Sequence, residues 1–167
     1  ALEANSDGIE LDVQMTRDGH VVIIHDETVE RTTDGTGRAI DYTLAELQKL
    51  NAAAPWGDGS AFHAIPSFEE YCSWVASTPL ITNIEIKSSV IYYPELEKKT
   101  LALIKAHHLE GRVLISSFNH LSLIESKRLA PALPCGVLVP NPGLVNAGYG
   151  IKHFGFEYYH PAYSSLD

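Results

Sequence analysis

The sequence has 167 residues, of which 45% are hydrophobic and 20% are charged, and this composition is typical of one globular domain. The formal net charge of −9 argues against nucleic acids and anionic lipid surfaces as partners. No apolar run approaches the roughly 20 residues that a membrane-spanning helix needs, so we expect no stable insertion into a membrane.

The first predicted element is a strand at residues 8–13, with the sequence Gly-Ile-Glu-Leu-Asp-Val. Side chains alternate between the two faces of a strand, so Glu10 and Asp12 share one face and the three apolar residues share the other. An Asp-Gly turn then leads to a second, almost continuously apolar strand at residues 21–25. This strand ends in His25, which is followed by Asp26.

Residues 30–64 depart from this regular pattern, and we expect them to form an insertion of loops and one short helix. The loop chemistry lies at residues 32–37, and a capping box formed by Thr43 and Glu46 predicts the start of the helix. A second capping box, Ser67 with Glu70, predicts the start of the next helix. No linker or low-complexity segment divides the chain into further domains.

Strands and helices alternate through the rest of the chain, which predicts βαβ units and a mostly parallel sheet. The predicted elements are a strand at 80–87, a helix at 94–106, a strand at 112–117, a helix at 119–129, a strand at 135–139, a short helix at 144–152 and a strand at 156–160. Counting the first two strands, the chain supplies about six strands of an α/β fold.

Charged side chains lie on two of these strands, where the chemistry of a site is expected. Glu85 and Lys87 share one face of the strand at 80–87, as Glu10 and Asp12 do on the first strand. In parallel α/β folds the carboxyl ends of the strands carry the sites, and oxygen ligands suit Ca²⁺ and Mg²⁺. Three carboxylates on one interior repel each other unless a cation or a proton compensates them. The alternative to a metal site is a structural network of ion pairs.

His25 and Lys87 each have two interpretations from the residues alone. A histidine at a strand end can carry a proton near neutral pH, or it can be an ordinary loop or core histidine. Lys87 can be the ion-pair partner of Glu85, or it can bind a phosphate oxygen. The sequence contains no HExxH, paired CxxC, P-loop or G-x-S-x-G motif, so zinc-protease, nucleotide-binding and α/β-hydrolase functions are not supported.

The remaining composition bears on the location of the protein. Cys72 and Cys135 have no close spacing, and we expect buried thiols, with a disulfide as the open alternative. The sequence begins with Ala1 and its only methionine is Met15, so we expect that the natural N-terminus is missing. We expect a cytoplasmic protein, and a periplasmic or secreted one stays open because a signal peptide could have been removed.

Taken together, residues 8–19 and 22–26 resemble the glycerophosphodiester phosphodiesterase family, which has an E-x-D strand, a T-x-D-G hairpin and an H-D strand end in this order. The resemblance continues, in order, through residues 32–37, 43–47, 65–70, 83–87 and 116–118. It implies a TIM-type (β/α)₈ barrel that hydrolyses small-molecule glycerophosphodiesters to glycerol 3-phosphate and an alcohol. The insertion at 30–64 would lie over the barrel mouth.

The resemblance also implies roles for individual residues. Glu10, Asp12 and Glu85 would be the ligands of a divalent cation, Ca²⁺ or Mg²⁺. His25 would be one of two general acid/base histidines, Lys87 would neutralise phosphoryl oxygens, and Phe118 would shape the glycerol side of the pocket.

The resemblance is incomplete at both ends. The family's first strand with H-R-G and the P-E-N-T helix start are absent, and the last barrel strand is expected after residue 167. A complete barrel usually has at least about 200 residues. We therefore expect residues 1–167 to form a single partial barrel domain, which could be inactive by itself or associate as a homo-oligomer. The alternatives to the phosphodiesterase are a non-catalytic binding module of the same fold and a related phospholipase.

Overall fold

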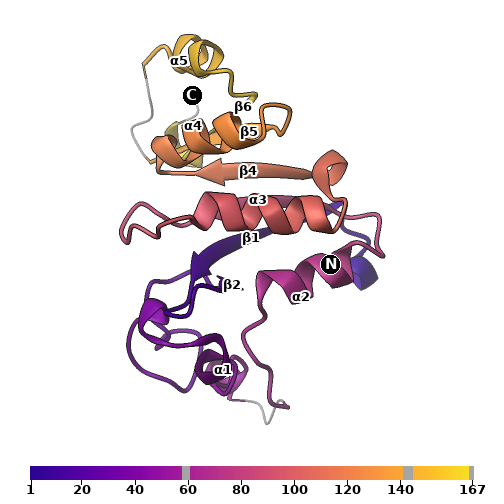
Figure 1. The fold of residues 1–167 in the computed structure, drawn as a ribbon, viewed down its shortest axis with the longest axis vertical. Helices are drawn as coiled ribbons and strands as arrows, with labels where there is room; N and C mark the ends of the chain where they lie inside the picture. Colours follow the sequence, from indigo (N-terminus) through magenta and orange to yellow (C-terminus); the bar gives the residue numbers. More distant parts are fainter. Residues whose placement is uncertain (58–60, 141–144, 166–167) are drawn as a thin grey trace.

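The computed structural model describes residues 1–57, 61–140 and 145–165 of the chain. Its strands form one six-stranded sheet in the order β2-β1-β3-β4-β5-β6 (Figure 1). The strands are β1 (Gly8–Met15), β2 (Val21–Ile23), β3 (Ile81–Ile86), β4 (Val113–Ser117), β5 (Cys135–Val139) and β6 (Tyr158–Pro161). The sheet is open, with β2 at one edge and β6 at the other, which is the arrangement of an incomplete α/β barrel.

Five of the six strands run parallel, and β2 is the exception. The neighbouring pairs β1–β3, β3–β4, β4–β5 and β5–β6 are all parallel. The pair β1–β2 is antiparallel, with Val13 opposite Ile23. The direction of β2 follows from the tight turn before it, where Gly19 has a φ of 81° that favours glycine. A parallel neighbour needs a crossover of a dozen or more residues, and none separates β1 from β2. The predicted hairpin therefore supplies the edge strand, and β1 pairs directly with β3.

The helices follow the strands along the chain and cover one face of the sheet. Figure 1 shows α3 in front of the central strands, with α2 and α4 on either side of it. The helices are α1 (Leu44–Leu47), α2 (Phe68–Val75), α3 (Leu96–Ala106), α4 (His120–Leu129) and α5 (Ala147–Phe154), with single 3₁₀ turns η1 (Leu2–Ala4), η2 (Ala39–Asp41), η3 (Ala54–Trp56), η4 (Glu110–Arg112) and η5 (Tyr163–Ser165). Each predicted helix is found. Leu144, where the last one was expected to begin, lies outside the described residues.

The main hydrophobic core lies between this helix layer and the sheet. It contains the apolar side chains that alternate with the charged ones on the strands, among them Leu11, Val13, Ile84 and Ile86. The predicted alternation is thus confirmed: the apolar face of β1 and β3 packs on helices, and Glu10 and Asp12 lie on the other face. That second face corresponds to the interior of a barrel.

A second, smaller core holds the segment between β2 and α2. Its buried side chains are Val22, Ile24, Val29, Ala39, Leu47 and Ile65. Both predicted capping boxes are present: in each case the Ser or Thr hydroxyl accepts from the backbone of the Glu, whose carboxylate accepts from the backbone of the Ser or Thr. The capping boxes fix the starts of α1 and α2, and the apolar contacts of Val22 and Ile24 hold the segment against the end of β2.

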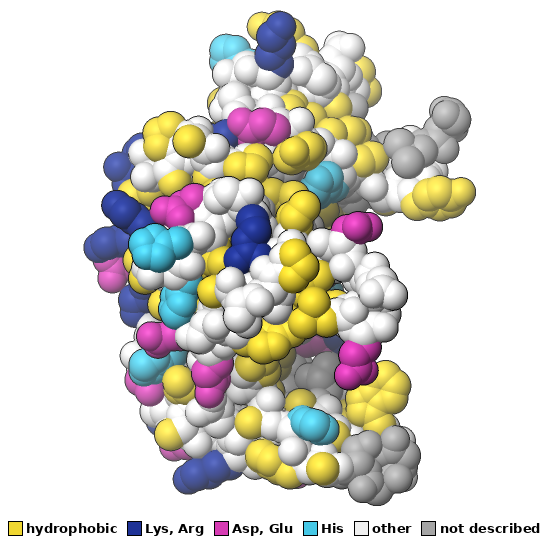
Figure 2. Space-filling model, turned by 90° about the vertical axis from the view of Figure 1, so that its right-hand side faces the viewer, with side chains coloured by type: hydrophobic (Ala, Val, Ile, Leu, Met, Phe, Trp, Pro, Cys, Tyr) yellow, Lys and Arg dark blue, Asp and Glu magenta, His cyan; other side chains and the backbone are white. Residues whose placement is uncertain are grey.

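The cysteines and the surface agree with the composition. Cys72 and Cys135 are free and buried, and burial raises the pKa of Cys72 to about 12 and that of Cys135 to about 11. No described helix has both the length and the apolar character required to cross a membrane. Figure 2 shows hydrophobic patches interspersed with acidic and basic side chains on one face of the molecule, so the negative net charge is not gathered there.

Candidate functional site

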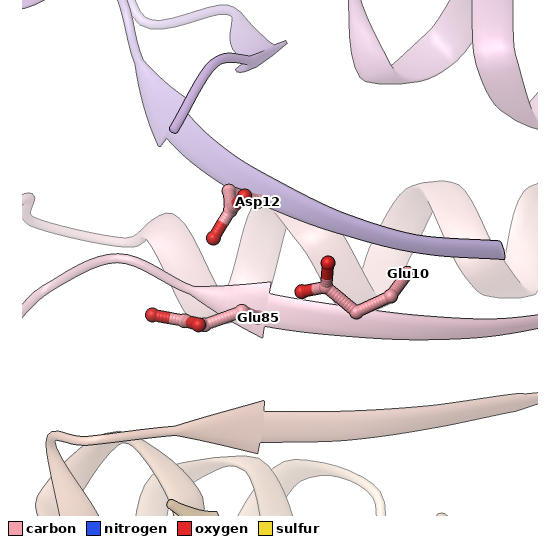
Figure 3. A group of neighbouring side chains, drawn as sticks. All are labelled: Glu10, Asp12 and Glu85. Carbon is pink, nitrogen blue, oxygen red and sulfur yellow. The ribbon is translucent and has the colours of Figure 1, made fainter. Parts of the chain in front are cut away.

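Three carboxylates converge on the sheet face opposite the helices. Glu10 and Asp12 come from β1 and Glu85 from β3, and the parallel register places Asp12 directly beside Glu85. One carboxylate oxygen from each of the three residues lies within 4.8 Å of the other two. Figure 3 shows the three side chains pointing toward a common space between the two strands. The two strands that the sequence singled out therefore do bring their acidic groups together.

The electrostatics of this cluster are unfavourable as it stands. Burial raises the pKa values of Glu10, Asp12 and Glu85, and the charges of neighbouring carboxylates raise them further. Lys87 opposes the shift: its Nζ lies 3.3 Å from Glu85 Oε1 and 3.9 Å from Asp12 Oδ1. One ammonium group faces three carboxylates, so the cluster retains an excess of negative charge that a proton or a cation must balance.

The donor set fits a hard divalent cation. Ca²⁺ binds oxygens at about 2.3–2.6 Å, so two ligand oxygens of one ion lie at most roughly 5 Å apart, and the three oxygens of this cluster satisfy that limit. Among the described residues, the buried Oδ1 of Asn83 has no hydrogen-bond partner, and Asn83 is the register neighbour of Glu10. This amide oxygen suits the same kind of ion. The cluster offers only oxygen atoms, which favours Ca²⁺ or Mg²⁺ over zinc.

His25 lies just beyond β2, and it is not a core histidine because 59% of its side chain is exposed. Its Nδ1 lies 2.6 Å from Asp26 Oδ1, and Arg31 donates to both Asp26 oxygens at 2.5 and 2.7 Å. The Arg31 guanidinium holds the pKa of Asp26 well below its usual range. With Nδ1 facing Asp26, the imidazole can exchange a proton through Nε2. A positive charge on His25 partly opposes the rise in the pKa values of the three clustered carboxyl groups.

Gln14 supports this arrangement, and the sequence reasoning missed it. It is fully buried, and its Nε2 donates to three consecutive backbone oxygens, those of Ile24 at 3.1 Å, His25 at 3.0 Å and Asp26 at 2.8 Å. Its Oε1 accepts a 2.7 Å hydrogen bond from the Tyr93 hydroxyl. Gln14 therefore fixes the backbone that carries His25. Its spacing of two from Asp12, on the same strand face, was the signal that could have revealed it.

Arg31 was also not identified from the sequence. For Phe118, which was identified, the structure gives a location but not a function. Arg31 lies in a loop six residues after His25, and no motif distinguishes it from a surface arginine. Phe118 directly follows β4, and the residue is 43% exposed. Phe118 therefore lies at the edge of the sheet where the parallel strands have their carboxyl ends. Lys87, which follows β3, lies at the same edge.

Comparison with known proteins gives one consistent family. The model of the "Glycerophosphoryl diester phosphodiesterase family" matches residues 1–164. A glycerophosphodiester phosphodiesterase of Caldanaerobacter subterraneus is 44% identical over 166 residues, which are 99% of this chain and 68% of that protein. A glycerophosphodiester phosphodiesterase of Bacillus subtilis is 35% identical over 148 residues, covering 80% of this chain and 50% of that protein.

A solved structure extends the comparison to three dimensions. A phosphodiesterase of Oleispira antarctica, in complex with the product sn-glycerol-3-phosphate, has a TM-score of 0.85 and 29% identity to this chain. The match covers 99% of this chain and 67% of the other. This chain thus spans between half and about two thirds of the relatives described here.

Proposed function

Because the chain belongs to the glycerophosphoryl diester phosphodiesterase family, we propose that the full-length protein hydrolyses glycerophosphodiesters to glycerol 3-phosphate and an alcohol. The observation that carries this proposal is the convergence of carboxylates from β1 and β3, with Lys87 beside them and His25 nearby. The product bound to the Oleispira relative supports the same reaction.

Glu10, Asp12 and Glu85 would hold the divalent cation, with Ca²⁺ and Mg²⁺ both suited to their oxygens. When bound, such a cation draws negative charge off the phosphoryl oxygens as the transition state forms. Three side chains from two strands are needed for this, because a single carboxylate supplies too few oxygen ligands and too little negative charge to hold a divalent cation.

The chain's own residues would bind the phosphodiester and move protons. The Lys87 ammonium would contact a non-bridging phosphoryl oxygen and lower its negative charge. His25, in its protonated form, would donate the Nε2 proton to the ester oxygen of the departing alcohol as the P–O bond to that oxygen breaks. The oxygen of a water molecule would form the new bond to phosphorus and release its proton, which returns His25 to the protonated form. Asp26 and Arg31 would keep the imidazole in the orientation that this transfer needs. Phe118 would line the glycerol side, and residues 30–64 would lie over the mouth of the barrel.

The proposal is tested by measuring glycerol 3-phosphate release from glycerophosphocholine by the full-length protein, with and without a chelator. We expect release that Ca²⁺ or Mg²⁺ restores, and at least a hundredfold loss in Glu10→Gln and Glu85→Gln. The matched control is Glu125→Gln, which removes an exposed carboxylate on α4 that pairs only with Arg128 among its recorded contacts. Wild-type rates in the two site variants would refute the assignment of these carboxylates.

A binding measurement separates the catalytic function from a non-catalytic module of the same fold. Calorimetric titration of the full-length protein with glycerophosphocholine in the presence of the cation would detect binding. Binding without release of glycerol 3-phosphate would exclude the phosphodiesterase and favour the binding module.

A further inference from the structure

A pocket opens beside His25, the proposed general acid. It lies between the end of β2 and the segment that follows, and it has a volume of about 340 Å³. The residues that define its character are Ile24, His25, Arg31, Trp56, Ile65 and Pro66. Volumes of this order are typical of sites for small organic groups. None of the three clustered carboxylates lines this pocket, so it is separate from the candidate cation site.

The lining of the pocket is apolar apart from a few polar groups. Ile24 and Ile65 are buried in the smaller core and close one wall of the pocket. Arg31 contributes a positive charge that is held in two hydrogen bonds with Asp26, and His25 Nδ1 shares the same carboxylate. Trp56 is 78% exposed, so its indole face is accessible to a ligand. The described lining includes no carboxylate, and Thr32 is its one hydroxyl-bearing residue.

The position of His25 connects this pocket to the reaction. A general acid must come within about 2.6–3.2 Å of the atom that it protonates. The ester oxygen of the departing alcohol therefore lies against His25, and the carbon chain attached to that oxygen begins there. Since His25 is part of the pocket wall, the alcohol can extend into the pocket while the phosphate faces Lys87 and the carboxylates.

We propose that this pocket binds the alcohol part of the substrate and that Trp56 makes it selective for a quaternary ammonium head group, as in glycerophosphocholine. This inference rests on the proposed function. Quaternary ammonium groups are bound by aromatic faces and need no hydrogen-bond acceptor. A primary ammonium group needs acceptors and a polyol needs several polar partners, and the described lining offers few of either.

The experiment compares the full-length protein and its variants on substrates that differ only in the alcohol. Wild type is expected to show a higher kcat/KM for glycerophosphocholine than for glycerophosphoethanolamine, glycerophosphoglycerol or the ethyl ester of glycerol 3-phosphate. In Trp56→Ala we expect the ratio of kcat/KM for glycerophosphocholine to kcat/KM for the ethyl ester to decrease by about 3- to 30-fold relative to wild type. Trp56→Phe keeps most of the preference, since it keeps an aromatic face.

The control is Trp74→Ala, which removes the other tryptophan, a partly exposed side chain on α2 that packs on Tyr71. It should leave the substrate ratio at the wild-type value. An unchanged ratio in Trp56→Ala, or a wild-type preference for the polyol head group, would overturn the pocket assignment while leaving the phosphodiesterase in place. Failure of wild type to hydrolyse any of the four substrates would overturn the proposed function, and the pocket assignment with it.

Discussion

Replacing Gln14 by leucine tests whether this buried amide holds the backbone that carries His25 at the end of β2. The substitution keeps the approximate size of the side chain but removes the donor to three backbone oxygens and the acceptor for the Tyr93 hydroxyl. An amide nitrogen has two hydrogens, so at most two of the three carbonyl contacts are full hydrogen bonds. Each buried polar group that is left without a partner costs about 1–3 kcal/mol.

The expected loss follows from counting the groups that water cannot reach. The Tyr93 hydroxyl and the Ile24 carbonyl are buried, whereas the contacts to His25 and Asp26 are only partly buried. Two strongly penalised groups, offset in part by the apolar gain from leucine, give a destabilisation of about 2–4 kcal/mol. Urea unfolding of the full-length protein measures this value, and kcat should fall too because the His25 backbone is no longer fixed.

Tyr93→Phe is the matched control for this experiment. It leaves one buried acceptor, Gln14 Oε1, without a partner and keeps the three carbonyl contacts, so it should cost about 1–2 kcal/mol, less than Gln14→Leu, and keep kcat near the wild-type value. A Gln14→Leu protein within 0.5 kcal/mol of wild type would refute the reasoning. So would equal losses of stability and kcat in both variants.

Three further predictions concern the site itself. His25→Asn should lower kcat for glycerophosphocholine by roughly 10²- to 10⁴-fold. It should lower kcat much less for the p-nitrophenyl ester of glycerol 3-phosphate, because p-nitrophenolate leaves without a proton. Equal losses of kcat on the two substrates would contradict the role of His25 as a general acid. In chelator, burial raises the folded-state pKa values of Glu10, Asp12 and Glu85, so their stabilising contribution is complete below about pH 4 and is lost as the pH rises through the raised values. Urea unfolding at several pH values should therefore show a shallower loss of stability with rising pH in Glu85→Gln, and a steeper loss would contradict this. Lys87→Met should enlarge the increase in Tm that Ca²⁺ or Mg²⁺ produces, because Nζ competes for the Glu85 oxygen, while raising KM; a smaller increase in Tm would oppose this.

Much of this site was predictable because strand alternation is a local rule. The period of two placed Glu10 with Asp12 and Glu85 with Lys87, and the structure keeps both pairs on one face of the sheet. Local rules do not predict that the two pairs come together, because this contact depends on β1 lying next to β3. That adjacency arises because the hairpin sends β2 to the sheet edge, and the Asp-Gly pair predicts the turn but not the order of the strands.

The supporting residues could not be predicted for a different physical reason. Gln14 acts through backbone carbonyl oxygens, and every residue has one, so its partners have no sequence signature. Arg31 pairs with Asp26 across a loop whose path depends on the smaller core beneath it. The pocket beside His25 likewise depends on how residues 52–56 return toward β2, which periodicity does not describe.

The charge balance of the site explains why these residue types belong together. Three carboxylates and Lys87 sum to −2, which is unstable in a partly buried place and agrees with the raised pKa values of the acids. A divalent cation would bring this sum to zero. A phosphodiester carries one negative charge, so its entry would bring the net charge of the site to −1. A protonated His25 would return this net charge to zero. On this count Lys87 is the group that lets three acids and one divalent cation form a neutral site. The negative substrate then meets no net repulsion from the residues that hold it.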